Sequence, residues 1–88
     1  YAGRNLFDMT AYVYIVRCSD STLYTGWTYD VDKRILAHNN GSGAKYTRGR
    51  TPVLLCYTES FETKEEALSR EMEIKKLKRS EKEKLLEC

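Results

Sequence analysis

The chain has 88 residues, 41% of them hydrophobic, and a formal net charge of +2. This length supports one small domain around one core. No apolar run approaches the roughly 20 residues that a membrane span requires, and the polar N-terminus does not resemble a signal peptide. Three widely spaced cysteines without a CxxC pair argue against a disulfide framework or a zinc site. We therefore expect a cytoplasmic protein with no membrane partner.

Residues 1–8 show no hydrophobic periodicity and precede Met9. We interpret them as a tag or a disordered N-terminus and assign residues 9–88 to a single domain.

Two segments near the N-terminus predict a hairpin. Residues 11–17 and 22–28 are rich in aromatic and β-branched types and read as strands, with a tight turn at residues 19–21. Residues 30–41 then predict a short helix with Asp30 as its N-cap and an Asn-Gly stop. After a loop that contains glycine and proline, residues 53–61 predict a third strand.

Two helices are expected after that strand. Thr63 followed by Glu66 has the spacing of a capping box, and the helical pattern runs from there to about Lys78. Ser80 with Glu83 repeats the signal and predicts a last helix over residues 80–87. The order β-β-α-β-α-α predicts a mixed α/β (α+β) fold, in which a small three-stranded antiparallel sheet is flanked by helices.

The hairpin places two tyrosines on one face. With a three-residue turn, Tyr14 faces Gly26 and Val16 faces Tyr24, so Tyr14 and Tyr24 become diagonal neighbours. A two-residue turn would put them on opposite faces. Gly26 lies inside a strand, where glycine often marks close approach by another backbone or a ligand. Simple aromatic packing is the alternative reading.

The first predicted helix carries two basic groups on one side. At 100° per residue, Arg34 and His38 flank the apolar stripe of Val31 and Ile35 and look toward the edge of the core. Two groups of like sign on one face suggest an anion site, although a histidine beside an apolar stripe is often structural.

Glu71 lies in the middle of the apolar arc of the next helix, between Ala67 and Ile74 on one side and Leu68 and Met72 on the other. A buried unpaired charge is costly, so this carboxylate needs an arginine, a metal ion or a retained proton. A salt bridge and a Mg²⁺ site are both open, because Mg²⁺ sites use few protein carboxylates and keep several waters.

The charges are unevenly distributed along the chain. No acidic residue lies between Asp32 and Glu59. The basic residues of that segment are Lys33, Arg34, Lys45, Arg48 and Arg50. Such a cluster attracts polyanions such as nucleic acids, whereas a solvated basic loop is the alternative.

In this order and spacing, the motifs resemble the GIY-YIG endonuclease superfamily. YVY at 12–14 stands where GIY lies in that family, and YTG at 24–26 matches YIG. Arg34 follows ten residues after Tyr24, and Glu71 lies in REMEIKKL. The segment HNNGSGAKYTRGRTP is similar to the small stand-alone bacterial subfamily, which itself resembles the nuclease domain of structure-specific, junction-cleaving endonucleases. The resemblance spans most of the chain.

The resemblance implies a metal-dependent endonuclease that hydrolyses nucleic-acid phosphodiesters, with DNA as the expected substrate. The catalytic residues that it implies are Tyr14, Tyr24, Arg34, His38 and Glu71. Tyr24 would be the general base, assisted by Tyr14 and His38, and Arg34 would contact the phosphoryl oxygens. Glu71 would hold one Mg²⁺, for which Mn²⁺ is a possible substitute.

Nucleic-acid binding is expected at the second strand and in the basic loop. The residues assigned to it are Gly26, Lys45, Tyr46, Arg48 and Arg50. The loop cations would neutralise phosphates, Tyr46 would stack on a base, and Gly26 would leave room for a phosphate.

The sequence shows no recognition helix or zinc finger, so we expect structure-directed or weakly sequence-specific binding, with a protein partner as a second source of specificity. The alternatives are a nucleic-acid-binding module with weak or partner-dependent catalysis and a purely structural partner-binding domain.

Overall fold

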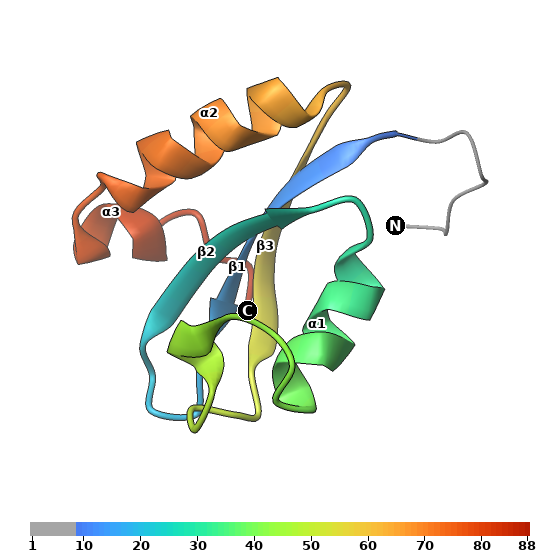
Figure 1. The fold of residues 1–88 in the computed structure, drawn as a ribbon. Helices are drawn as coiled ribbons and strands as arrows, with labels where there is room; N and C mark the ends of the chain where they lie inside the picture. Colours follow the sequence, from blue (N-terminus) through green and yellow to red (C-terminus); the bar gives the residue numbers. More distant parts are fainter. Residues whose placement is uncertain (1–8) are drawn as a thin grey trace.

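The computed structural model describes residues 9–88, so the expected tag or disordered segment, residues 1–8, lies outside the described residues. Its elements follow the predicted order (Figure 1). They are β1 (Ala11–Arg17), β2 (Leu23–Thr28), α1 (Val31–Asn39), the 3₁₀ turn η1 (Lys45–Thr47), β3 (Leu54–Phe61), α2 (Lys64–Lys75) and α3 (Arg79–Glu83). The predicted α+β class is therefore confirmed. Among the described residues, no helix is both long enough and apolar enough to cross a bilayer.

The sheet has the strand order β2-β1-β3, and both pairs are antiparallel. Tyr14 pairs with Gly26 and Val16 with Tyr24, which is the register of a three-residue turn. Ser21 adopts φ 70°, a left-handed conformation that lets the chain reverse. The predicted placement of both tyrosines on one face is confirmed.

β1 is the central strand and sends alternate side chains to two different environments. Ala11, Val13 and Ile15 pack against Ala67 and Ile74 of α2, and all five residues are buried. We call this side the apolar face.

The opposite face of β1 carries Tyr14 and Val16, which pack with Cys18 and Val53. We call this side the tyrosine face. In Figure 1, α2 and α3 lie on one side of the sheet, and α1 with the η1 turn lies on the other.

The caps of the first two helices agree with the sequence. The Asp30 carboxylate accepts a hydrogen bond from the Lys33 N–H at 3.1 Å, and the Thr63 hydroxyl accepts one from the Glu66 N–H at 3.2 Å. α2 ends at Lys75 rather than near Lys78, because the chain tightens into shorter-range bonds at its C-terminus.

The last helix differs from its prediction at both ends. α3 begins at Arg79, because the Lys78 N–H is capped by the Glu81 carboxylate at 2.9 Å, so Ser80 is not the cap. It ends at Glu83 rather than at residue 87, since the tail turns back to β3, where the Glu87 N–H donates to the Cys56 carbonyl at 2.7 Å.

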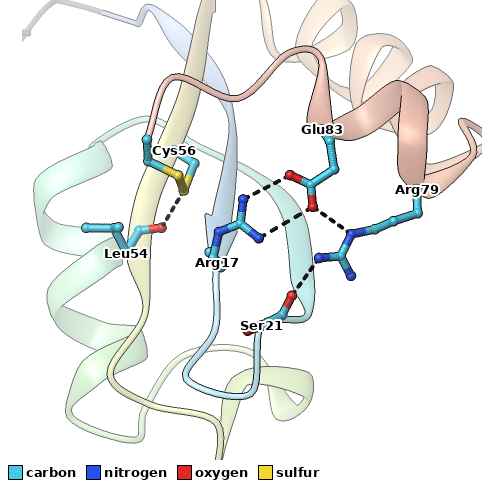
Figure 2. Close-up of a disulfide and its surroundings, with 7 residues drawn as sticks. Arg17, Ser21, Leu54, Cys56, Arg79 and Glu83 are labelled. Carbon is cyan, nitrogen blue, oxygen red and sulfur yellow. Dashed lines mark hydrogen bonds and ion pairs between the residues drawn. A yellow bond between two sulfur atoms is a disulfide. The ribbon is translucent and has the colours of Figure 1, made fainter.

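A disulfide ties this tail to β3. Cys56 is bonded to Cys88, with their Cα atoms 4.7 Å apart (Figure 2). Cys18 keeps a buried free thiol. The expectation that the cysteines form no disulfide is wrong for this pair. The sequence separation of 32 residues gave no sign that the fold would bring them together. The cytoplasmic location, which rested in part on the cysteines, stays a prediction.

An ion-pair network fixes α3 to the hairpin. The Glu83 carboxylate accepts from Arg17 of β1 and from Arg79, each at 2.9 Å, and Arg79 also donates to the Ser21 carbonyl at 2.8 Å (Figure 2). The hydrogen bonds from Arg17 and Arg79 lower the pKa of Glu83.

Candidate active site

A buried hydrogen-bond chain connects β1, α1 and the η1 turn. The Tyr14 hydroxyl lies 2.8 Å from Nε2 of His38, and Nδ1 of His38 lies 2.7 Å from Oγ1 of Thr47. Thr47 in turn donates to the Ala44 carbonyl at 2.9 Å. Tyr14, His38 and Thr47 are fully buried. His38 therefore lies deeper than the predicted position at the edge of the core.

Arg34 joins this chain from the same side of α1. Its Nε donates to the Tyr14 hydroxyl at 3.3 Å. The hydrogen bond to Tyr14, assisted by the neighbouring Tyr24, raises the pKa of the Arg34 guanidinium above its ordinary value. The predicted association of Arg34 and His38 is thus present, and both side chains meet at Tyr14.

The two tyrosines have different environments. Their ring centroids are 6.4 Å apart, and Tyr24 also meets the His38 ring at 5.4 Å. Burial raises the pKa of Tyr14 to about 12, although the hydrogen bond from Arg34 acts in the opposite direction. Tyr14 therefore stays a protonated phenol at neutral pH. Tyr24 is only partly buried, so it is the more exposed of the two phenols.

Two glycines make this packing possible. A Cβ at Gly26 would lie 2.6 Å from the Tyr14 hydroxyl, and one at Gly43 would lie 2.5 Å from Nδ1 of His38. Gly26 does permit a close approach, as its position in a strand suggested, but the Tyr14 side chain fills the space. The role of Gly26 in phosphate binding stays a prediction.

Glu71 is held on α2 with 14% of its side chain exposed, and its Oε2 lies 3.4 Å from Nζ of Lys75. The expected ion pair is therefore present, with a lysine in place of an arginine. The Glu71 charge is the smallest of the causes that raise the pKa of Tyr14. The buried stripe of α2 is narrower than predicted, because Met72 is 59% exposed.

The side chains of the described residues fit a magnesium site and do not fit a zinc site. Within residues 9–88, no group of three or more His, Cys, Asp or Glu side chains converges into a metal cage. A zinc-type centre among those residues therefore does not fit. Glu71 fits Mg²⁺, which needs one or two protein carboxylates and keeps water or substrate oxygens at its other positions. The Lys75 partner is 52% exposed, so the existing ion pair is weak.

The basic loop extends the cluster toward the surface. The Tyr46 ring stacks on Tyr24 with centroids 5.7 Å apart and an interplanar angle of 24°. The Arg50 guanidinium lies 4.3 Å from the Tyr46 centroid and forms an ion pair with Asp20 at 2.7 Å. Tyr46 is 43% exposed. The loop thus contacts the tyrosine face through Tyr46, and Arg50 already has an acidic partner.

The remaining loop cations, Lys45 and Arg48, are exposed beside this contact. The structure therefore brings all but Glu71 of the implied catalytic residues into direct contact, with the loop beside them.

Sequence reasoning missed Thr47 and Gly43. Both ring nitrogens of a buried histidine need hydrogen-bond partners. This requirement was the signal that His38 would bond a hydroxyl group. The sequence could not show which of the nearby hydroxyl residues provides it, since that depends on how the loop folds over α1.

Known proteins similar to this chain identify its family. Residues 10–84 match the model of the GIY-YIG catalytic domain. The chain is 64% identical over 75 residues to a UPF0213 protein of Clostridium perfringens, covering 85% of this chain and 81% of that protein. It is 60% identical to a UPF0213 protein of Halobacterium salinarum, covering 84% and 96%.

Two solution structures are also similar. A UPF0213 protein of Bacillus halodurans aligns with a TM-score of 0.57 at 55% identity, covering 88% of this chain and 82% of that one. A protein of E. faecalis aligns with a TM-score of 0.58 at 39% identity, covering 86% and 82%. Together with the family match, these likenesses show that the chain belongs to the GIY-YIG catalytic-domain family.

Proposed function

We propose that the protein is a metal-dependent endonuclease that hydrolyses phosphodiester bonds, with DNA as its substrate. The observation that carries the proposal is the meeting of Arg34 and His38 at the Tyr14 hydroxyl beside the partly buried Tyr24. A base candidate, a cation for the phosphoryl group and a carboxylate for a metal form a competent set for phosphodiester hydrolysis.

Tyr24 is the proposed general base, because it is the more exposed phenol of the pair. A general base acts through its position as well as its proton affinity, and Arg34 places a positive charge beside both tyrosines.

Arg34 has a second role at the phosphoryl group. Its Nε donates a hydrogen bond to the Tyr14 hydroxyl. Its terminal N–H groups form a rigid fork suited to phosphoryl oxygens, whose negative charge increases in the transition state. The hydrogen bond to Tyr14 thereby fixes the guanidinium before substrate arrives.

Glu71 is the proposed ligand for Mg²⁺, with Mn²⁺ as a substitute. When bound, the ion polarises a phosphoryl oxygen and supports the leaving oxygen. The ion would replace Lys75 as the partner of Glu71, and the exposed Lys75 side chain would turn to solvent.

The exposed cations Lys45 and Arg48 would neutralise phosphates, and Tyr46 and Arg50 would extend that contact toward Tyr24. None of these groups is arranged as a base-reading helix, so cleavage directed by nucleic-acid shape is proposed, with a partner protein as an additional source of specificity. A cytoplasmic role in DNA repair belongs to the same proposal.

The test is cleavage of labelled single-stranded, duplex, flap and branched DNAs with Mg²⁺, with Mn²⁺ and with EDTA. Wild type is compared with Glu71→Gln and with the matched variant Glu73→Gln, which alters an exposed carboxylate on the same helix. We expect wild type and Glu73→Gln to cut with either metal, and Glu71→Gln to bind without cutting.

Salt-dependent binding without cleavage by wild type would instead indicate a nucleic-acid-binding module. The absence of both binding and cleavage would leave a structural partner-binding domain.

A further inference from the structure

His38 lies between two hydroxyl groups in the interior. Its Nε2 is 2.8 Å from the Tyr14 hydroxyl and its Nδ1 is 2.7 Å from Oγ1 of Thr47, and all three side chains are fully buried. A neutral imidazole carries one donor nitrogen and one acceptor nitrogen. The two distances alone do not say which nitrogen carries the hydrogen.

The second hydrogen bond of the Thr47 hydroxyl, to the Ala44 carbonyl, indicates the assignment. A threonine hydroxyl has one hydrogen, and the Ala44 carbonyl 2.9 Å away can only accept. With the Thr47 hydrogen directed at that carbonyl, the Thr47 oxygen accepts a hydrogen bond from His38, and Nδ1 carries the hydrogen. Nε2 is then bare and accepts from the Tyr14 hydroxyl.

The direction of the chain continues to Arg34. Since the Tyr14 hydrogen is directed at His38, the Tyr14 oxygen is available to accept the Arg34 Nε–H, at 3.3 Å. Burial, together with the charge of Arg34, lowers the pKa of His38, which keeps the ring neutral at neutral pH. Every donor in the series Arg34, Tyr14, His38, Thr47 thus points the same way and ends at a main-chain carbonyl.

We infer that Thr47 is a positioning residue that holds His38 as the Nδ1–H tautomer and thereby orients the Tyr14 hydroxyl away from Arg34. With the opposite tautomer, His38 and Arg34 would both donate to the Tyr14 oxygen, and the Tyr14 hydrogen would have to turn elsewhere. Arg34 would then share its acceptor and lose its fixed position. The effect on catalysis rests on the proposed endonuclease function, whereas the tautomer does not.

The loop that supplies Thr47 is the loop that reaches the substrate side. Tyr46, the residue before it, stacks on Tyr24, and Gly43 leaves no room for any side chain against His38. Tyr46, which stacks on Tyr24, and Thr47, which bonds His38, are therefore adjacent in sequence. Displacement of the loop would disturb both contacts together.

The tautomer of His38 can be measured directly by NMR. His38 is the single histidine of the chain, so tag-free protein labelled with ¹⁵N-histidine gives one imidazole in long-range ¹H–¹⁵N spectra at neutral pH. We expect a protonated Nδ1 and a bare Nε2 in wild type and in Thr47→Ser, which keeps the hydroxyl. Thr47→Val removes the acceptor and should give the Nε2–H form or a mixture.

A wild-type spectrum with Nε2–H would overturn the inference, and so would a Thr47→Val spectrum identical to that of wild type. Because wild type alone can contradict the assignment, the test does not depend on the folding of Thr47→Val, which circular dichroism checks.

Turnover supplies the second readout. We expect slower turnover in Thr47→Val, because Arg34 would lose its fixed position, with recovery in Thr47→Ser. Full activity in a Thr47→Val protein with a changed tautomer would overturn the catalytic role. The spectra are recorded without nucleic acid, so a wild type that does not cleave contradicts the proposed function while the tautomer is still decided.

Discussion

The two faces of β1 are built from neighbouring residues of one strand, yet they are held together by different forces. On the apolar face, Val13 and Ile15 pack on Ala67 and Ile74, and partly buried aromatic residues such as Trp27 surround them. On the tyrosine face, Tyr14 lies equally deep but is held by hydrogen bonds to His38 and Arg34. Apolar packing tolerates small adjustments, whereas a hydrogen-bond chain depends on each member.

This difference separates stability from chemistry within a small domain. The apolar face supplies non-directional burial, which scales with area. On the tyrosine face, hydrogen bonds fix the orientation of the titratable groups. Substitutions on the first should therefore reduce stability, and substitutions on the second should reduce activity more than stability.

Ile15→Ala should give the largest effect on the fold. Removing a fully buried aliphatic side chain costs about 2–5 kcal/mol, a large part of the roughly 5–15 kcal/mol that stabilises a typical domain. Tyr14→Phe, next to it on the strand, should cost less, about 1–3 kcal/mol, because it removes only a hydroxyl. Urea unfolding of both variants measures the order, and a greater loss in Tyr14→Phe would contradict the comparison.

Gly26→Ala should affect the tyrosine face more strongly than its size suggests. The added Cβ would lie 2.6 Å from the Tyr14 hydroxyl, so the ring must shift away from His38 and Arg34. Overpacking of this kind costs about 1–3 kcal/mol. A double-mutant cycle with Tyr14→Phe, which removes the nearest atom, should show less than additive losses in unfolding free energy. Additive losses would mean that the two positions do not meet.

The smallest effect is expected from pH. Burial lowers the pKa of His38, so below the ordinary value of 6.5 the unfolded chain binds a proton that the folded protein does not. The contribution of His38 to the free energy of unfolding is therefore present above that pH and is lost as the pH falls. As the pH falls, the urea midpoint of wild type should decrease, and the midpoint of His38→Gln should change less. A midpoint that rises on acidification would indicate that the folded protein prefers a charged His38.

The hairpin shows what the sequence can predict. A turn of three residues fixes the register, and the register alone puts Tyr14 beside Tyr24 and opposite Gly26. Helical periodicity likewise put Arg34 and His38 on one side of α1. These relations are local, so a single sequence is sufficient to predict them.

What the sequence did not show depends on contacts between distant segments. The Cys56–Cys88 disulfide and the early end of α3 both follow from the return of the tail to β3. Thr47 became a partner of His38 because the basic loop folds back over α1. No periodicity encodes such meetings, because they are properties of the packed chain.

The most direct test is the single-turnover cleavage rate of a branched DNA at saturating protein with Mg²⁺, for wild type, Tyr24→Phe and Tyr57→Phe. Tyr57→Phe is the control, since it removes a hydroxyl that bonds Glu59 on β3. We predict that Tyr57→Phe cuts like wild type, whereas Tyr24→Phe binds and unfolds like wild type but cuts about 10²- to 10⁴-fold more slowly, the usual contribution of a general base. Cleavage by Tyr24→Phe at the wild-type rate would contradict the assignment of the tyrosine face as the catalytic site.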